Sequence, residues 1–289
     1  MKSSSLRPLQ ERFAAEVTGV EVRTVHNPSE LGSIREAMDR FAVVVFRGQP
    51  LSDAEQLAFA ERFDGKLHTR TGAAVLRKNR FGNEALSDIS NVDEDGELMQ
   101  AGDRRRMYGL GNRLWHTDAS FEDPPGRYSM LHARVIPAVD ADTEFADMRA
   151  AYDELDGATK AKLERLKVHH SIAYSRATLG FEFSEEERAK LQGAVHPLVR
   201  TNPSTGRRSL YLASHASHVV GWPVPEGRLL LRDLIEHATQ PRRFVYRHSW
   251  RAADLVIWDN LATMHRARPF DDSAHRRELR RVTTLDLRS

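Results

Sequence analysis

Short strand-like runs separated by helix-like segments restrict the fold more than any other feature of this sequence. They are rich in β-branched and aromatic residues and do not follow the regular strand-helix alternation of a parallel sheet. Many short strands with irregular crossings favour a jelly-roll-like barrel, so we expect a β-rich α+β fold. The runs occupy residues 42–46, 128–136, 168–174, 209–214, 243–250, 254–259 and 280–287.

Helix signals lie between these runs. Asn27 followed by Pro28 is typical of an N-cap with proline at the first helical position, which predicts a helix to about Phe41. Capping boxes, with Ser at the N-cap and Glu three residues later, predict helix starts at 52–55 and 184–187. Two consecutive helices are expected over 147–167, broken at Asp156-Gly157, and another over 226–238.

The bulk composition is that of an ordinary globular protein. The chain has 289 residues, a net charge of +2 and no long Gly/Ser/Pro linker, which predicts a single domain over 1–289. No run approaches the roughly 18 apolar residues of a membrane span, and the N-terminus has no apolar signal segment. We therefore expect a cytoplasmic protein that binds neither membrane nor nucleic acid. Because there is no cysteine, His, Asp and Glu must hold any metal.

The stretch "LWHTDASF" contains a candidate metal site. Alternate side chains of an extended strand share a face, so His116 and Asp118 can converge on one point. A third ligand is available in "IWDNLATMHRARPF", where a strand ends, the chain turns and His265 follows. Two histidines and one carboxylate on one face of an ion form the facial triad of non-haem Fe(II) oxygenases. The predicted triad is His116, Asp118 and His265.

Other interpretations of the histidines have to be weighed. A His-x-Asp pair by itself is more often a structural hydrogen bond than a metal site. The adjacent His169 and His170 would point to opposite faces of a strand, with one exposed, so they are poor joint ligands. His215 and His218 have no acidic partner in their motif, which favours substrate-binding or core positions.

The arginine cluster "HRRELRR" supports a site for anions. Strand alternation places Arg277 and Arg281 on one face and Arg280 on the other. The first two would lie about 13 Å apart along the strand, far enough to bind two different anions. Arginine suits this role because its planar fork binds carboxylates bidentately. For Arg276 and Arg280 a solvated basic surface is the favoured interpretation.

These motifs together resemble the Fe(II)/2-oxoglutarate-dependent dioxygenases of the taurine dioxygenase type, and within them the 2,4-dichlorophenoxyacetate (aryloxyalkanoate) dioxygenases. The resemblance extends from about Phe41 to the end of the chain. It implies a double-stranded β-helix core, jelly-roll and cupin-like, with flanking helices. The segments that carry it include "LWHTDASF", "DTEFADMRAAYDEL", "HPLVRT", "HASHVVG", "FVYRH" and "ELRR".

The resemblance implies a role for each matching residue. His116, Asp118 and His265 become the Fe(II) ligands and the catalytic centre. Thr143 matches the threonine that contacts the C1 carboxylate of 2-oxoglutarate, and Arg277 matches the arginine that binds its C5 carboxylate.

Three further positions match the substrate pocket. Arg281 would bind the anionic group of the substrate, His215 would contact the same carboxylate, and Asn112 would line the pocket. Aromatic walls are expected from Trp115, Phe121 and Trp222, for which core packing is an equal alternative. The chain departs from the family pattern before Thr143: Asp140-Ala141 stand where Gly-Gly is usual, which puts the local loop path in doubt because glycine permits positive φ.

The implied activity is hydroxylation, with O2 and 2-oxoglutarate, of the carbon next to the ether oxygen of an aryloxyalkanoate such as 2,4-dichlorophenoxyacetate. The products would be a phenol, glyoxylate, succinate and CO2. Alternatives are a taurine-like sulfonate dioxygenase and a non-catalytic 2-oxoglutarate or metal sensor; a nucleic-acid binder is disfavoured by the small net charge. We expect a small anionic aromatic substrate, a homo-oligomer, and a mobile lid over 68–87.

Overall fold

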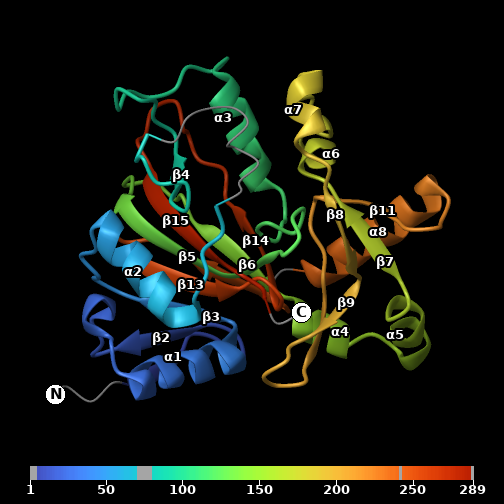
Figure 1. The fold of residues 1–289 in the computed structure, drawn as a ribbon, viewed down its shortest axis with the longest axis horizontal. Coiled ribbons are helices and arrows are strands. Elements are labelled where there is room, and N and C mark those ends of the chain that lie inside the picture. The colour runs from blue at the N-terminus through green and yellow to red at the C-terminus, as the bar shows by residue number, and fades with distance from the viewer. Residues whose placement is uncertain (1–4, 70–79, 241–242, 288–289) are drawn as a thin grey trace.

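The largest sheet of the computed structural model, which describes residues 5–69, 80–240 and 243–287, has seven strands in these ranges (Figure 1). Only the β2–β3 pair is parallel among the neighbours of this sheet in the described residues. In spatial order the strands are β1 (Ser5–Pro8), β2 (Ala15–Thr18), β3 (Val43–Phe46), β13 (Leu255–Asp259), β5 (Gly126–Val135), β15 (Glu278–Leu285) and β4 (Ser87–Ser90).

Smaller sheets complete the β-structure. One consists of β12 (Val245–His248), β6 (Thr143–Asp147) and β14 (Thr263–Ala267), a second of β11 (Ala216–Val219), β7 (Lys167–His170) and β8 (Ala194–Pro197), and a third of β10 (Arg208–Leu210) and β9 (Val199–Thr201). No sheet closes on itself into a barrel within the described ranges. The fold is thus sheet-rich with helices around the sheets.

The helices begin where the capping signals place them. Asn27 accepts a hydrogen bond from the Ser29 backbone at the start of α1, and both predicted capping boxes form. None of the helices in the described part of the chain is long and apolar enough to cross a bilayer. The helices are η1 (Val22–Thr24), α1 (Pro28–Phe41), α2 (Asp53–Asp64), α3 (Arg104–Gly109), η3 (Leu110–Arg113), α4 (Met148–Asp153), α5 (Gly157–Leu163), α6 (Ile172–Ala177), α7 (Glu185–Ala189) and α8 (Val224–Ala238).

The large sheet is buried on both faces because its central strands are apolar at successive positions. Alternation sends Val44 toward α1 and α2, where Phe63 belongs to the same apolar cluster. It sends Val45 and Trp258 to the opposite face, where they pack with Phe145 of β6. The sheet therefore lies between a helical layer and the sheet β12-β6-β14. Figure 1 shows α1 and α2 on one side of the molecule and α4, α5 and α8 on the other.

Two predicted strands are wrong in part. The run at 168–174 leaves the strand after His170, because the Ser171 side chain caps α6 by accepting a hydrogen bond from the Tyr174 backbone. The run at 209–214 keeps only β10, because the Ser214 backbone N–H turns away to donate to Trp115 O at 2.7 Å. The remaining predicted strands and helices are confirmed, with boundary shifts of a few residues.

The expectation that Arg280 is solvated is also wrong. Its residue is 8% exposed, it pairs with Asp88 and Glu278, and its guanidinium lies 3.9 Å from the centroid of the Phe81 ring. The reason is that Asp88 and Phe81, from the segment that leads into and forms β4, cover this face of β15. Arg276, just before the strand, is exposed as predicted.

A buried ion pair at the end of β13 gives a test of the fold. Arg127 Nη2 lies 3.2 Å from Asp259 Oδ2, and both side chains are almost fully buried. Asp259→Asn should lower the free energy of unfolding by about 3–5 kcal/mol in urea titrations, because it leaves a buried guanidinium without its counter-charge. The double variant with Arg127→Met should recover a large part of that loss. Equal losses in the single and double variants would contradict this account.

Candidate active site

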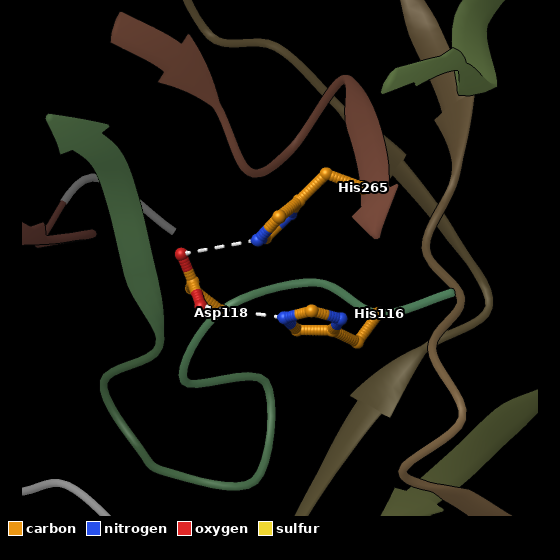
Figure 2. A group of neighbouring side chains, drawn as sticks. All are labelled: His116, Asp118 and His265. Carbon is orange, nitrogen blue, oxygen red and sulfur yellow. Dashed lines mark ion pairs between the residues drawn. The ribbon is translucent and has the colours of Figure 1, made fainter. Parts of the chain in front are cut away.

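Two histidines far apart in the sequence are joined by their backbones. His116 N donates to His265 O at 2.9 Å, and His265 N donates to His116 O at 2.8 Å. This bridge attaches the loop after η3 to the strand β14. It brings the imidazole ring centroids to 4.1 Å from each other (Figure 2).

Asp118 completes the predicted group. Its Oδ1 lies 3.9 Å from His116 Nε2 and its Oδ2 lies 3.7 Å from His265 Nε2, and all three side chains are buried (Figure 2). One ligand atom from each residue lies within 4.8 Å of the others. Thr117, between the pair, points elsewhere and donates to Leu212 O at 2.8 Å. His116 and Asp118 therefore meet at one point as predicted, although the segment is a single bridge followed by a turn and not the expected strand.

Two residues that the sequence analysis missed orient this carboxylate. Ser129 of β5 donates to Asp118 Oδ2 at 2.8 Å, and Asn260 Nδ2 donates to Ser129 Oγ at 2.9 Å. Asn260 Oδ1 also accepts from the Asp118 backbone N–H at 3.1 Å. Asn260 stands in the "WDN" motif, but nothing in the sequence indicates that the turn folds back onto Asp118.

Hydrogen bonding fixes the form of His116. Its Nδ1 lies 2.8 Å from Leu114 O, and since a carbonyl can only accept, Nδ1 carries the proton and Nε2 presents a lone pair toward Asp118. Burial lowers the pKa of His116 to about 4 and that of His265 well below its usual value. Burial raises the pKa of Asp118, but Arg281 and the two imidazoles outweigh it and lower that pKa to about 2.

The donor set fits a divalent metal ion. Near neutral pH it offers two uncharged imidazoles and one carboxylate from a buried position, with no second carboxylate in the group. Nitrogen and oxygen ligands of this kind suit Fe(II), and a carboxylate next to two histidines is the set used by non-haem iron oxygenases.

A cavity of about 800 Å³ opens beside the triad. Its wall includes the predicted residues Asn112, His116, Asp118, His215, Arg277 and Arg281, together with Phe121. A small recess of about 30 Å³ adjoins it and adds Thr143 and His265 to the wall. Trp115 and Trp222 pack instead against the apolar cluster around α4 and α8, so core packing is the outcome for these two.

Arg277 is a buried cation without an ion-pair partner in the described structure. The residue is 6% exposed, its backbone exchanges hydrogen bonds with Asn91, and its buried Nε has no hydrogen-bond partner among the described residues. Burial lowers the pKa of its guanidinium to about 10, against the attraction of Asp142, so it remains charged at neutral pH. Arg281, which lies further along the same segment on β15, donates to Asp118 Oδ1. Both predicted arginines thus face the cavity.

Thr143 opens β6 at the edge of the recess. Its Oγ1 accepts a hydrogen bond from Trp250 Nε1 at 2.9 Å. The doubt about the preceding loop is removed, because neither Asp140 nor Ala141 is among the described residues with positive φ. The loop is held by Asp142, which accepts from Ser249 Oγ at 3.0 Å.

The remaining histidines are not ligands of this group. His215 is buried at the cavity wall, 5.1 Å from the Phe121 ring centroid, and its Nδ1 lies 2.8 Å from Ser175 Oγ. His170 is buried and His169 is partly exposed, stacked on His218 with centroids 5.1 Å apart. None of these four histidines belongs to the group around Asp118 among the described residues, and the interpretation that set them aside as metal ligands stays a prediction.

Residues on both sides of the segment 70–79, which lies outside the described residues, also line the cavity. They include His68, Thr69 and the stretch 82–87. The lid predicted over 68–87 falls partly outside the described residues and stays a prediction.

The triad and its cavity define the class of protein: a mononuclear non-haem metal oxygenase. Comparison with known proteins gives the family. Residues 5–283 match the family model described as taurine catabolism dioxygenase TauD, TfdA family, and the chain belongs to this family.

Its relatives match over nearly their whole length. The chain is 46% identical over 289 residues to the alpha-ketoglutarate-dependent 2,4-dichlorophenoxyacetate dioxygenase of Burkholderia sp. (strain RASC), covering 100% of this chain and 95% of that protein. It is 36% identical to the (S)-phenoxypropionate/alpha-ketoglutarate-dioxygenase of Sphingobium herbicidovorans, covering 92% and 90%. The crystal structure of AAD-2 in complex with Mn(II) and N-oxalylglycine superposes with a TM-score of 0.89 at 44% identity, covering 99% of this chain and 98% of that one.

The network around Asp118 gives a prediction about metal affinity. Ser129→Ala removes the hydroxyl that donates to Asp118 Oδ2 and should weaken Mn(II) binding about 10-fold, since such supporting bonds orient metal ligands. Calorimetric titration of the purified variant measures this. Ser249→Ala, which removes a hydroxyl at the neighbouring loop, is the control and should bind Mn(II) as the wild type does. Unchanged affinity in Ser129→Ala would show that Asp118 needs no such support.

Proposed function

We propose that this protein is an Fe(II)- and 2-oxoglutarate-dependent dioxygenase that cleaves aryloxyalkanoates such as 2,4-dichlorophenoxyacetate. The observation that carries the proposal is the buried His116-Asp118-His265 group on the wall of a cavity that also contains two inward-facing guanidiniums. The names of the full-length relatives support the substrate class. We further propose that the large sheet and the sheet β12-β6-β14 form the double-stranded β-helix, or jelly-roll, core of the cupin-like oxygenases.

His116, Asp118 and His265 would hold the Fe(II) through Nε2, a carboxylate oxygen and Nε2. With 2-oxoglutarate and O2 bound, the iron supplies the oxidation that inserts one oxygen atom into a C–H bond, while 2-oxoglutarate becomes succinate and CO2. The protein contributes orientation: the backbone bridge fixes both imidazoles, and Ser129 with Asn260 fixes the carboxylate.

Arg277 and Thr143 would bind 2-oxoglutarate. A buried guanidinium with no ion-pair partner in the described structure is costly unless an anion binds beside it. The C5 carboxylate of 2-oxoglutarate supplies that anion, and the planar fork of Arg277 can bind it bidentately. Thr143 Oγ1, which accepts from Trp250, can direct its own hydrogen to the C1 carboxylate.

The aryloxyalkanoate would occupy the large cavity. Arg281 would bind its carboxylate, with Asn112 and His215 on the wall and Phe121 as an apolar surface for the ring. This places the carbon between the carboxylate and the ether oxygen toward the triad. Hydroxylation of this carbon gives a hemiacetal. The bond between this carbon and the ether oxygen then breaks, which leaves a phenol and glyoxylate.

A turnover assay tests this function. Protein loaded anaerobically with Fe(II) and 2-oxoglutarate should, after admission of O2, release phenol from 2,4-dichlorophenoxyacetate with one succinate per O2. His116→Ala should lose at least about 1,000-fold in rate, because metal centres contribute several kcal/mol to such barriers. His169→Ala, a partly exposed histidine away from the cavity, is the matched control and should keep wild-type activity.

The outcomes separate the alternatives. O2 uptake with taurine but no phenol from the aryl ether would replace the substrate with a sulfonate. Binding of 2-oxoglutarate with no O2 uptake for any anion would indicate a sensor and end the catalytic proposal.

The role of Arg277 has its own prediction. Arg277→Met should raise the KM for 2-oxoglutarate about 10- to 100-fold, because one charge-assisted bidentate contact is lost, while the KM for the aryl ether changes little. Steady-state kinetics with each substrate varied in turn measures the difference. A selective rise in the KM for the aryl ether would assign Arg277 to the other anion.

A further inference from the structure

A second buried arginine on the cavity wall is not used by the function proposed above. Six arginines are buried in the described part of the chain. Four of them pair with aspartates, and the two without an ion-pair partner in the described residues, Arg277 and Arg176, both line the large cavity. The four pairs are Arg127 with Asp259, Arg149 with Asp147, Arg200 with Asp286 and Arg280 with Asp88.

Arg176 lies on α6 and is 3% exposed. Its Nη1 donates to Ser175 Oγ at 3.2 Å, its guanidinium lies 4.5 Å from the centroid of the Tyr108 ring, and its buried Nε has no hydrogen-bond partner in the described structure. Burial lowers the pKa of Arg176, which means that its charge is held at a cost. Among the described residues only the neutral groups of Tyr108 and Ser175 offset this charge, so an anion in the cavity would supply the missing counter-charge.

The backbone reserves space for this guanidinium. A Cβ added at Gly111 of η3 would overlap Cζ, Nη1 and Nε of Arg176. Gly111 and the Tyr108 ring therefore both lie against the guanidinium and restrict its position. A side chain that merely filled space would not need a glycine opposite its charged end. Gly111 and Tyr108 belong to the same segment that contains Asn112 and leads to His116.

Arg281 and Arg277, the two cavity cations assigned above, already have a neighbour or a separate position. Arg281 donates to Asp118, and Arg277 lines the small recess with Thr143. His215 is a poor donor to a carboxylate in this arrangement. Ser175 directs its hydroxyl hydrogen to Ile172 O, so it accepts from His215 Nδ1, which leaves His215 Nε2 with a lone pair and no hydrogen.

We infer that Arg176 binds the carboxylate of the aryloxyalkanoate, as a second guanidinium beside Arg281. The inference rests on the proposed function and deepens it. Ser175 joins Arg176 to His215, so this histidine holds the serine and, through it, the arginine in place. A carboxylate between two guanidiniums has donors for both of its oxygens, which fixes the direction of the alkyl carbon as well as its distance.

The test compares a charged ligand with its uncharged analogue. Arg176→Met should raise the KM and the Kd for 2,4-dichlorophenoxyacetate about 10- to 100-fold, the loss expected for a charge-assisted contact. The Kd is measured calorimetrically on protein loaded with Mn(II) and N-oxalylglycine. Affinity for 2,4-dichlorophenoxyacetamide, which has no charge, should change less than about 2-fold, and the KM for 2-oxoglutarate should stay the same.

Arg228→Met is the matched control. Arg228 of α8 also stacks on a tyrosine, with its guanidinium 4.6 Å from the ring centroid of Tyr174 on α6. It is exposed and does not line the cavity. It should leave both ligands unaffected. Equal losses for acid and amide in Arg176→Met, or no loss for either, would overturn the inference.

Gly111→Ala provides a second route that keeps every charge. The new methyl group should displace the guanidinium and reproduce the selective loss of the acid, which also answers the case in which Arg176→Met does not fold. Wild-type affinity for the acid in Gly111→Ala would count against the inference. If the wild-type protein releases no phenol from the aryl ether, the proposed function itself is wrong. If the wild type releases phenol but both variants bind the acid as the wild type does, the proposed function stands and only the role inferred for Arg176 is wrong.

Discussion

The pair of backbone hydrogen bonds between His116 and His265 is the constraint on which the site depends. A loop that follows a short 3-10 helix has no fixed position of its own, but the antiparallel bridge holds it beside β14. The distance between the two imidazoles is then set by strand geometry rather than by the side chains. Asp118 needs only to return to the same face two residues later, and the Asn260 amide, at the β13–β14 turn, receives its backbone N–H.

Local signals predicted much of this structure from the sequence. Caps and β-branched runs gave α1, both capping-box helices and most strands, since those features act within a few residues. The triad was predicted from the spacing of His116 and Asp118 and from the turn before His265. What could not be predicted depends on segments that meet in space. Ser129 has no distinguishing neighbours in its strand, and Arg176 follows a run predicted as a strand over 168–174, whereas Ser171 caps a helix there.

The arginines of β15 illustrate the same limit. Alternation correctly separated Arg277 and Arg281 from Arg280, because it is a property of the backbone. Whether each face of the strand is buried or lines the cavity depends on the residues that pack against it. A carboxylate and an aromatic ring from the 80–90 region cover Arg280, whereas the cavity faces the other two. A sequence pattern assigns residues to a face but does not tell whether that face meets solvent, protein or ligand.

The contact between Arg281 and Asp118 has a consequence for the order in which ligands arrive. One carboxylate oxygen is shared between a guanidinium and the position where a metal ion would bind, so each cation reduces the negative charge available to the other. Binding of metal and release of Arg281 are therefore thermodynamically linked, and the linkage acts in both directions. In the role proposed for Arg281, a metal ion that takes up the charge of Asp118 would therefore favour the exchange of this carboxylate for that of the substrate, which couples the two binding events.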